Sequence, residues 1–247
     1  MDRSVYIAMT GATQTMRAQD AVSHNLANAS TVGFKSELSA FQSVPVLGPG
    51  ANTRINAVAQ GIGQDETQGA IQHTGSPLDV AVNGPGWIAV QSPDGGEAYT
   101  RAGNLQIDAD GNLLDSRGNP VMGDGGPLTI PQSSQITIGK DGTISTVPMG
   151  QGPSTIAAVG KLKLVNPDPT QMSEGADGLM HMNDGSDADA DDTVTVTSGA
   201  LEASNVNPSS ELVKMISLSR QYEMQVRSIK TAEDDADDST KLLQTAS

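Results

Sequence analysis

The feature that most constrains this chain is a pair of helical patterns, one at each end. Near the N-terminus, four apolar residues recur at spacings of four, three and four: Val5, Met9, Ala12 and Met16. This spacing puts the four side chains on one stripe of a helix. We predict that helix from residue 1 to about 28. It is expected to end within residues 30–34 (STVGF), because β-branched residues and glycine disfavour a helix.

The second pattern occupies the C-terminal end. Residues 208–211 (PSSE) have the composition of a helix start, with proline and small polar residues ahead of an acid. An unbroken heptad series follows: Met215, Tyr222, Ile229, Ala236 and Leu243. Leu212 and Val226 lie on an adjoining row. We predict a helix from about residue 209, with a coiled-coil-like seam about 30 residues long.

Both helices are expected to need a partner. A single amphipathic helix of this length is marginal in water. Each helix could pack onto a β domain, which is the simpler interpretation. A narrow heptad stripe suits another helix better than a flat sheet. The pattern therefore favours terminal helices that pack on each other and on neighbouring subunits.

The middle of the chain is predicted to be β-rich. Glycine and proline punctuate residues 35–75, which we interpret as an extended connector with short strands. In residues 76–165, alternating segments separated by turn clusters recur every 8 to 12 residues, a spacing typical of a sandwich or open barrel. Residues 166–192 are polar and acidic and are expected to form a surface loop or a partly disordered excursion. The fold class is therefore α+β: a discontinuous domain of coiled-coil-like helices (1–34 plus 208–247) bracketing a β domain (76–207).

Composition excludes several classes of function. The absence of cysteine rules out a disulfide framework, a thiolate nucleophile and a cysteine-ligated zinc site. A net charge of -15 disfavours nucleic acid and anionic lipid as partners. The chain contains no apolar run of about 18 residues, so no membrane span is expected. Its first residues lack the apolar core of a signal peptide, so we expect it to stay inside the cell or to leave uncleaved.

Each motif that could carry chemistry lacks an element that the chemistry requires. Residues 84–89 (GPGWIA) fit a dinucleotide fingerprint, but strand formers follow where a helix is needed, so a tight turn is expected. His24, His73 and His181 lack a second histidine at ligand spacing. Residues 184–192 lack the glycine and glutamate offsets of a calcium loop. We predict no catalytic, cofactor-binding or metal-ligating residue, and no enzyme.

Two further functional classes fit poorly. A β domain that binds carbohydrate would present aromatic platforms, and only 2% of this chain is aromatic. A hydrolase would require a nucleophile and base pair, which the sequence does not offer.

Four ordered motifs resemble a known family. Residues 23–35 (SHNLANASTVGFK) resemble the N-terminal signature of the bacterial flagellar axial proteins of the rod and hook, with histidine at position 24 where asparagine is usual. Residues 78–87 (LDVAVNGPGW) resemble the strand-turn-strand of the same family, as do 99–104 (YTRAGN) with 110–113 (DGNL). Residues 199–208 (GALEASNVNP), followed by 220–223 (RQYE), match its C-terminal end. The short length and residues 76–79 (SPLD) are most similar to a proximal-rod subunit, with a distal-rod subunit the nearest alternative.

The resemblance implies a structural subunit of the flagellar basal body. Such a protein would leave uncleaved through the flagellum-specific type III export apparatus and build the rod in the periplasm. Its terminal helices would form an inner tube, and the β domain would lie outside. Its expected partners are neighbouring proximal- and distal-rod proteins, like copies of the chain and, transiently, the export apparatus. No cofactor is implied.

The predicted assembly interface combines helix stripes with residues of the N-terminal signature. Its members are Val5, Met9, Ala12, Met16, Asn25, Leu26, Asn28, Gly33, Phe34, Leu212, Met215, Tyr222, Val226, Ile229 and Leu243. Asn25 and Asn28 are expected either to fix the turn into the connector by hydrogen bonds or to cap the helix. Gly33 is expected to supply a backbone angle that other residues resist. In the free monomer we expect the helices to be mobile and to become ordered on assembly.

Overall fold

The computed structural model describes residues 3–45, 55–149 and 156–245, which fall into two compact units. The first, here the helical unit, comprises Met1–Ala29, Ser36–Gln64 and Val206–Ser247. The second, here the β unit, comprises Ser30–Lys35 and Asp65–Asn205. The predicted α+β class is confirmed, because helices at both ends of the chain bracket a mainly β region with open sheets.

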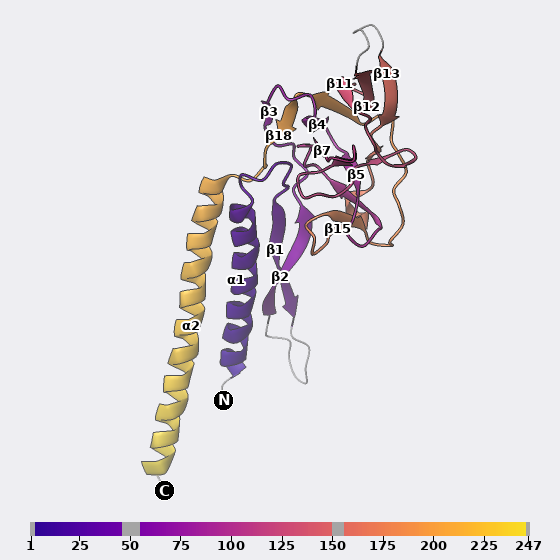
Figure 1. Ribbon diagram of the computed structural model, residues 1–247. Helices are drawn as coiled ribbons and strands as arrows, with labels where there is room; N and C mark the ends of the chain where they lie inside the picture. Colours follow the sequence, from indigo (N-terminus) through magenta and orange to yellow (C-terminus); the bar gives the residue numbers. More distant parts are fainter. Residues whose placement is uncertain (1–2, 46–54, 150–155, 246–247) are drawn as a thin grey trace. The chain divides into compact units, whose positions relative to one another are not determined.

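Two helices and one hairpin make up the helical unit. Helix α1 (Arg3–Ala27) runs antiparallel to α2 (Pro208–Thr245), with a hairpin of β1 (Glu37–Pro45) and β2 (Ile55–Gln64) on the other side of α1 (Figure 1). The side chain of Asn207 caps α2 by accepting hydrogen bonds from the amides of Ser209 and Ser210 at 3.1 and 3.2 Å. Pro208 follows this cap at the first helical position, where its missing N–H is not needed.

Helix α1 presents small side chains to its neighbours. Its buried residues are Ala8, Ala12, Gln14, Thr15, Ala18, Ala21, Val22 and Asn25. A Cβ atom on Gly11 would lie 3.1 Å from the side chain of Gln225, so the two helices approach closely there. The distance between packed helices depends on the side chains at their contact. Small residues therefore give α1 a tight seam but bury little apolar surface per residue.

The hairpin differs from the sequence expectation. Residues 35–75 were predicted to be an extended connector with short strands, whereas β1 and β2 span nine and ten residues and pair along their length. The hairpin belongs to the helical unit, where Gln14 Oε1 accepts a hydrogen bond from the amide of Ala59 at 3.0 Å. Every β1 residue after Glu37 is exposed, so no burial pattern imposes the alternation that marks a strand in sequence.

The β unit consists of antiparallel strands in several small open sheets. Its elements are β3 (Ile71–His73), β4 (Val80–Asn83), β5 (Trp87–Gln91), β6 (Glu97–Thr100), β7 (Gln106–Ile107), β8 (Leu113–Leu114), β9 (Met122–Gly123), β10 (Gly126–Pro127), β11 (Ser133–Ile138), β12 (Thr143–Pro148), β13 (Ala157–Lys161), β14 (Leu164–Val165), η1 (Pro169–Gln171), β15 (Met172–Glu174), β16 (Met180–Met182), β17 (Thr195–Ser198) and β18 (Ala200–Glu202). The largest sheet has the order β14-β5-β6-β16-β15, and β11, β12 and β13 form a second.

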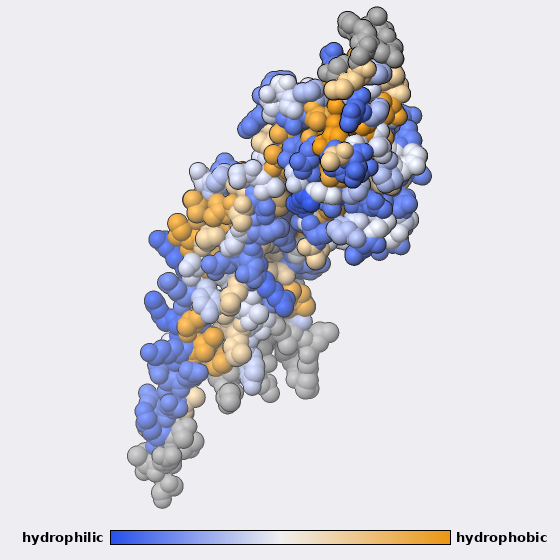
Figure 2. Space-filling model, in the orientation of Figure 1, coloured by the Kyte–Doolittle hydropathy of each residue, from blue (hydrophilic) through white to orange (hydrophobic). Residues whose placement is uncertain are grey.

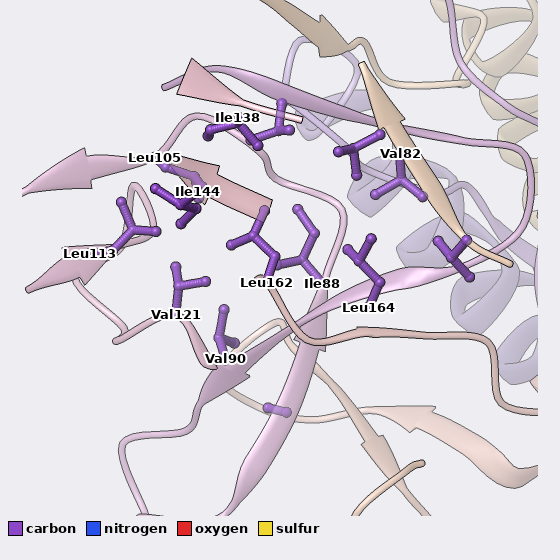
Figure 3. Packing of buried hydrophobic residues seen from close by; sticks show 14 of the residues in the cluster. Val82, Ile88, Val90, Leu105, Leu113, Val121, Ile138, Ile144, Leu162 and Leu164 are labelled. Carbon is purple, nitrogen blue, oxygen red and sulfur yellow. The ribbon is translucent and has the colours of Figure 1, made fainter. Parts of the chain in front are cut away.

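A sealed aliphatic core holds these sheets together (Figure 3). Side chains from sequence-distant strands meet in it, and Val82, Ile88, Val90, Leu113 and Leu162 are fully buried. The turn between β4 and β5 contains Gly84 and Gly86 with φ of +73° and +133°. This confirms the predicted tight turn, and residues 87–91 continue as strand β5 rather than as the helix that a nucleotide-binding loop requires.

The predicted acidic loop is only partly a loop. Within residues 166–192 lie β15 and β16, which pair with each other and join the largest sheet. Met172, Leu179 and Met180 are buried there, and the amide of buried Ala188 donates to Tyr99 Oη at 2.7 Å. The prediction failed because a few apolar anchors fix this segment despite its acidic composition.

Candidate assembly surfaces

The inner seam of α2 faces α1 within the helical unit. Residues at alternating spacings of four and three are buried or half-buried, and they define this inner seam: Glu211, Met215, Leu218, Tyr222, Gln225, Ile229 and Ala232. Three predicted interface residues, Met215, Tyr222 and Ile229, therefore lie on an intramolecular seam. Ala236 is exposed, and the side chain of Leu243 lies outside the part of the structure that is described.

A second apolar face of α2 points away from that seam. Its large side chains are 44–67% exposed and define the outer apolar face: Leu212, Val213, Ile216, Met224 and Val226. The sequence prediction named Leu212 and Val226 but missed Val213, Ile216 and Met224. A signal was available, because Val213 and Met224 are eleven residues apart, which is close to three helical turns. Figure 2 shows hydrophobic residues at the surface along this helix.

The predicted stripe on α1 divides between inside and outside. Ala12 is buried at 8% exposure and Val5 is half-buried. Met9 and Met16 are more than half exposed, as is Tyr6. Because Met9 and Met16 are seven residues apart, they lie on one face of the helix. That face offers two flexible apolar side chains to a partner.

The end of α1 is tied to the start of the hairpin. Buried Asn25 donates to the carbonyl of Glu37 at 3.0 Å and accepts from its amide at 2.8 Å. Asn28 instead donates to the carbonyl of His24 at 3.1 Å, so it acts as a local cap. Leu26 is half-buried beside them. The structure thus assigns one expected role to each asparagine.

Gly33 lies where the chain passes from α1 into the β unit. Its φ is +68°, and a Cβ atom at this position would lie 2.3 Å from the carbonyl carbon of Arg101. Both the backbone angle and the close approach require glycine. The expectation for Gly33 is confirmed, and the half-buried Phe34 accepts a hydrogen bond at its carbonyl from the amide of Asn205 at 3.3 Å.

Next to Gly33, three charged side chains form a buried cluster that the sequence did not predict. Lys35 Nζ lies 2.6 Å from Glu202 Oε1, and Arg101 Nη1 lies 2.9 Å from Glu202 Oε2. Their side chains are 1–2% exposed. We call Lys35, Arg101 and Glu202 the connector clamp. The Cζ atom of Arg101 also lies 5.3 Å from the centre of the Trp87 ring, a cation–π contact.

The connector clamp binds the three segments of the β unit that lead to or from the helical unit. Lys35 donates to the carbonyl of Thr67 at 2.7 Å, and Glu202 accepts from the amide of Gly69 at 2.9 Å. The Asn205 side chain adds a hydrogen bond to the carbonyl of Asp65 at 2.7 Å. Burial lowers the pKa of Lys35, while its hydrogen bond to Glu202 opposes that shift. The three connectors are therefore cross-linked within the β unit by charge-assisted bonds.

The hairpin carries a third exposed apolar set. Leu38, Phe41, Val44 and Ile62 are 41–66% exposed, and the described residues 38–45 and 55–64 include no charged side chain. A groove of about 350 Å³ lies between β1 and the two helices, with Ala18, Ala21 and Val22 of α1 among its lining residues. The floor of the groove is made of small apolar residues, whereas its walls include the charged Glu37, Glu211 and Lys214, so the groove suits a side chain with both apolar and polar parts.

The described residues contain no cluster of three or more His, Asp or Glu side chains placed to hold a metal ion. Within the described ranges, no helix has the length and apolar character required to cross a bilayer.

Comparison with known proteins decides what kind of chain this is. The family "Flagella basal body rod protein" matches residues 5–35, "Flagellar hook protein FlgE/F/G D1 domain" matches 81–146, and "Flagellar basal body rod FlgEFG protein C-terminal" matches 197–242. The flagellar basal-body rod protein FlgF of Salmonella typhimurium is 41% identical over 98% of this chain and 99% of its own length. That of Escherichia coli K12 is 42% identical with the same coverage.

The chain belongs to the bacterial flagellar basal-body rod protein family. The basal-body rod protein FlgG of Buchnera aphidicola subsp. Schizaphis graminum is more distant, at 32% identity over 93% of this chain and 95% of its own length. As a member of this family, the protein is a structural subunit of the flagellar basal-body rod, which serves cell motility, and it assembles with other axial subunits. The prediction that it is not an enzyme is confirmed by that membership.

Proposed function

We propose that the protein builds the proximal part of the rod by packing its terminal helices against like copies and neighbouring rod subunits. The observation that carries this proposal is where apolar surface lies exposed. Of the fifteen exposed large hydrophobic side chains among the described residues, twelve belong to the helical unit. Large apolar faces on a soluble protein mark sites of association.

The expected assembly interface joins the outer apolar face of α2, the Met9 and Met16 face of α1, and the hairpin groove. Complete burial of each large apolar side chain contributes roughly 1.5–3 kcal/mol. Ordering a helix opposes this by about 1–2 kcal/mol per residue of backbone entropy. Several neighbours must therefore be engaged at once, which favours a closely packed tube over an isolated pair.

The β unit would then lie outside the helices as a self-contained spacer. Its sealed core needs no partner, whereas the helices do. We infer that the chain leaves the cell uncleaved through the flagellar type III route and assembles in the periplasm. Marginally stable helices suit that route, because a chain whose ends become fully ordered only on assembly is easier to export unfolded.

A proximal position is supported by the identities, since the FlgF proteins of two bacteria reach 41 and 42% and the FlgG protein of a third reaches 32%. A distal-rod or hook-type position is the alternative. Cryo-electron microscopy of basal bodies would separate the two positions by locating a tag placed on the β unit of the full chain.

The decisive experiment replaces the exposed methionines in a strain that lacks the chromosomal gene. We expect Met9→Gln with Met16→Gln to abolish or strongly reduce swimming while the purified chain keeps its helical circular dichroism. Arg17→Gln is the control, because this exposed position of α1 lies about 100° around the helix from Met16, and the variant should swim normally. Normal motility of the methionine variant would contradict the proposed interface.

Hydrogen exchange tests whether the helices are only marginally stable in the monomer and become fully ordered on assembly. In dilute monomer, amides of residues 3–27 should exchange much faster than amides of β5 and β6. In purified basal bodies the same helical amides should be protected. Strong protection of residues 3–27 in the dilute monomer would overturn this part of the proposal.

A further inference from the structure

We propose that the acidic end of α2 from one copy lies along a basic ridge on α2 of a neighbouring copy, with the two helices parallel and shifted along their axes. This inference rests on the proposed assembly through the helices and adds an orientation and a spacing to it. The partner is a second copy of this chain, and the argument is charge complementarity between two segments of one helix.

The acidic segment extends beyond the end of α1. Helix α2 has 38 residues and α1 has 25, and Gly11 lies opposite Gln225 in the antiparallel pair. Arg3, the first residue of α1, is eight residues before Gly11 and thus opposite about residue 233. In agreement, the inner seam ends at Ala232, and every later residue of α2 with a described side chain is exposed. We call residues 233–245 the acidic overhang.

Five acids lie within six positions of the overhang: Glu233, Asp234, Asp235, Asp237 and Asp238. Lys241 is its one basic residue, and it pairs with Asp238 at 3.0 Å. Acids three and four apart on a helix repel one another. The C-terminal end of a helix also carries a partial negative charge, so acids are disfavoured there. The segment is thus unfavourable by itself and would be stabilised by an external positive charge.

A matching positive surface lies on the same helix. Arg220, Arg227 and Lys230 are exposed, and at 100° per residue they fall within an arc of about 80°. Their directions are opposite to that of the inner seam, so this basic ridge faces away from α1. Glu223 is the one acid among residues 214–230, whose other basic residue, Lys214, pairs with Glu211 at 2.6 Å. Figure 2 shows the hydrophilic surface that covers the C-terminal part of α2.

The positions of the basic ridge and the acids along α2 determine the axial shift between neighbouring copies. The centre of the basic ridge is near residue 226 and that of the acids near residue 236, so the shift between copies is about ten residues, or about 15 Å at 1.5 Å per residue. An antiparallel pair would also bring opposite charges together, but it would close into a dimer. A parallel, shifted pair leaves an acidic overhang at one end and a free basic ridge at the other, so copies can be added. A rod subunit needs the second arrangement.

The natural absence of cysteine makes a cross-linking test clean. Arg227→Cys with Asp237→Cys would be introduced into the full-length chain in flagellated cells, and basal bodies would be isolated after mild oxidation. We expect a ladder of disulfide-linked multimers on a non-reducing gel. Dimers alone would indicate antiparallel pairing and overturn the proposal. Efficient dimers from Arg227→Cys alone would indicate parallel helices without a shift and would also overturn it.

The absence of cross-links in rods that contain the double-cysteine chain would overturn this inference alone. Failure of the wild-type chain to enter rods would instead overturn the proposed function. Labelling of both cysteines with a maleimide in the purified monomer would show that they are accessible.

A charge exchange tests the same contact without cysteines. Arg220→Glu with Arg227→Glu should reduce swimming several-fold, and adding Glu233→Lys with Asp234→Lys should restore most of it. The exposed Lys140→Glu in the β unit is the control for a changed charge and should swim normally. A fourfold variant that keeps its helical circular dichroism but fails to swim would overturn the proposal.

Discussion

The two units of this protein solve the problem of burial in opposite ways. The β unit buries most of its valines, leucines and isoleucines in one core, whose members lie between Val80 and Val196 in the sequence. The helical unit buries mainly alanine on α1 and leaves Met9, Met16 and Ile216 exposed. Apolar area removed from water is the main stabilising contribution in folding. The β unit is therefore complete by itself, and the helical unit is completed by its neighbours.

This difference shows that apolar surface left exposed in the monomer can serve a function in assembly. A helix whose large apolar residues were all turned inward would be stable as a monomer but would offer nothing to an assembly. The helical unit instead buries mainly small residues of α1 and leaves large apolar residues of both helices exposed. Four variants or conditions test how far this contrast holds.

The largest effect is expected from Glu202→Gln in the connector clamp. Lys35 and Arg101 would keep buried positive charges with no anion between them, and breaking a buried pair costs about 3–5 kcal/mol. Urea unfolding followed by fluorescence of the single tryptophan, Trp87, reports on the β unit. The exposed Asp94→Asn should leave the midpoint nearly unchanged. A Glu202→Gln midpoint equal to that of the control would mean that the clamp does not stabilise the β unit.

Shortening an isoleucine to alanine should have contrasting effects in the two units. Ile88→Ala, at 0% exposure, should destabilise the β unit by about 2–5 kcal/mol, because it removes buried atoms and leaves a cavity. Ile216→Ala, at 55% exposure, should hardly change monomer unfolding but should reduce swimming. Urea unfolding and motility assays of both variants would check this. Equal destabilisation by the two changes would mean that Ile216 is as important to the monomer fold as Ile88, contrary to the contrast between the two units.

A smaller effect is expected for Asn25→Ala in the helical unit. The change leaves the Glu37 amide and carbonyl without their partner, and an unsatisfied buried group costs about 1–3 kcal/mol. Thermal unfolding followed by far-ultraviolet circular dichroism at 222 nm would report the loss. Asn28→Ala is the matched control, since the Asn28 side chain donates to a local carbonyl at a less buried position. If Asn28→Ala had as large an effect as Asn25→Ala, the hydrogen bonds between Asn25 and Glu37 would not be what stabilises the helical unit.

Acid should weaken the β unit before it affects the helices. Side-chain hydrogen bonds from Asn112, Thr143, Thr170 and Thr193, with nearby amides, lower the pKa of Asp108, Asp141, Asp168 and Asp191. A carboxylate whose folded pKa is depressed stabilises the fold above its unfolded pKa of about 3.9, and this contribution is lost as pH falls through the folded value.

The Trp87 urea midpoint should therefore drop between about pH 5 and pH 3. Asp108→Asn should flatten that drop. A midpoint that does not change over this range would show that these turns do not contribute to stability.

Much of the molecule could be predicted from the sequence. The stripes at both ends required helices, the alternation and turns between them required strands, and the motifs from 23–35 to 199–208 pointed to the rod family. Gly33 could be assigned a special backbone angle, which its φ of +68° confirms. The long hairpin could not be predicted, because exposed strands carry no alternation, and β15 with β16 was concealed by an acidic composition.

The sequence by itself determined which residues share a helix face, because that depends only on 3.6 residues per turn. It could not determine what covers each face. Only the tertiary structure turned Met215, Tyr222 and Ile229 towards α1 and left Leu212, Ile216 and Met9 exposed. It alone also brought Lys35 to Glu202, 167 positions along the chain, because such a contact arises from the packing of strands and not from any local pattern.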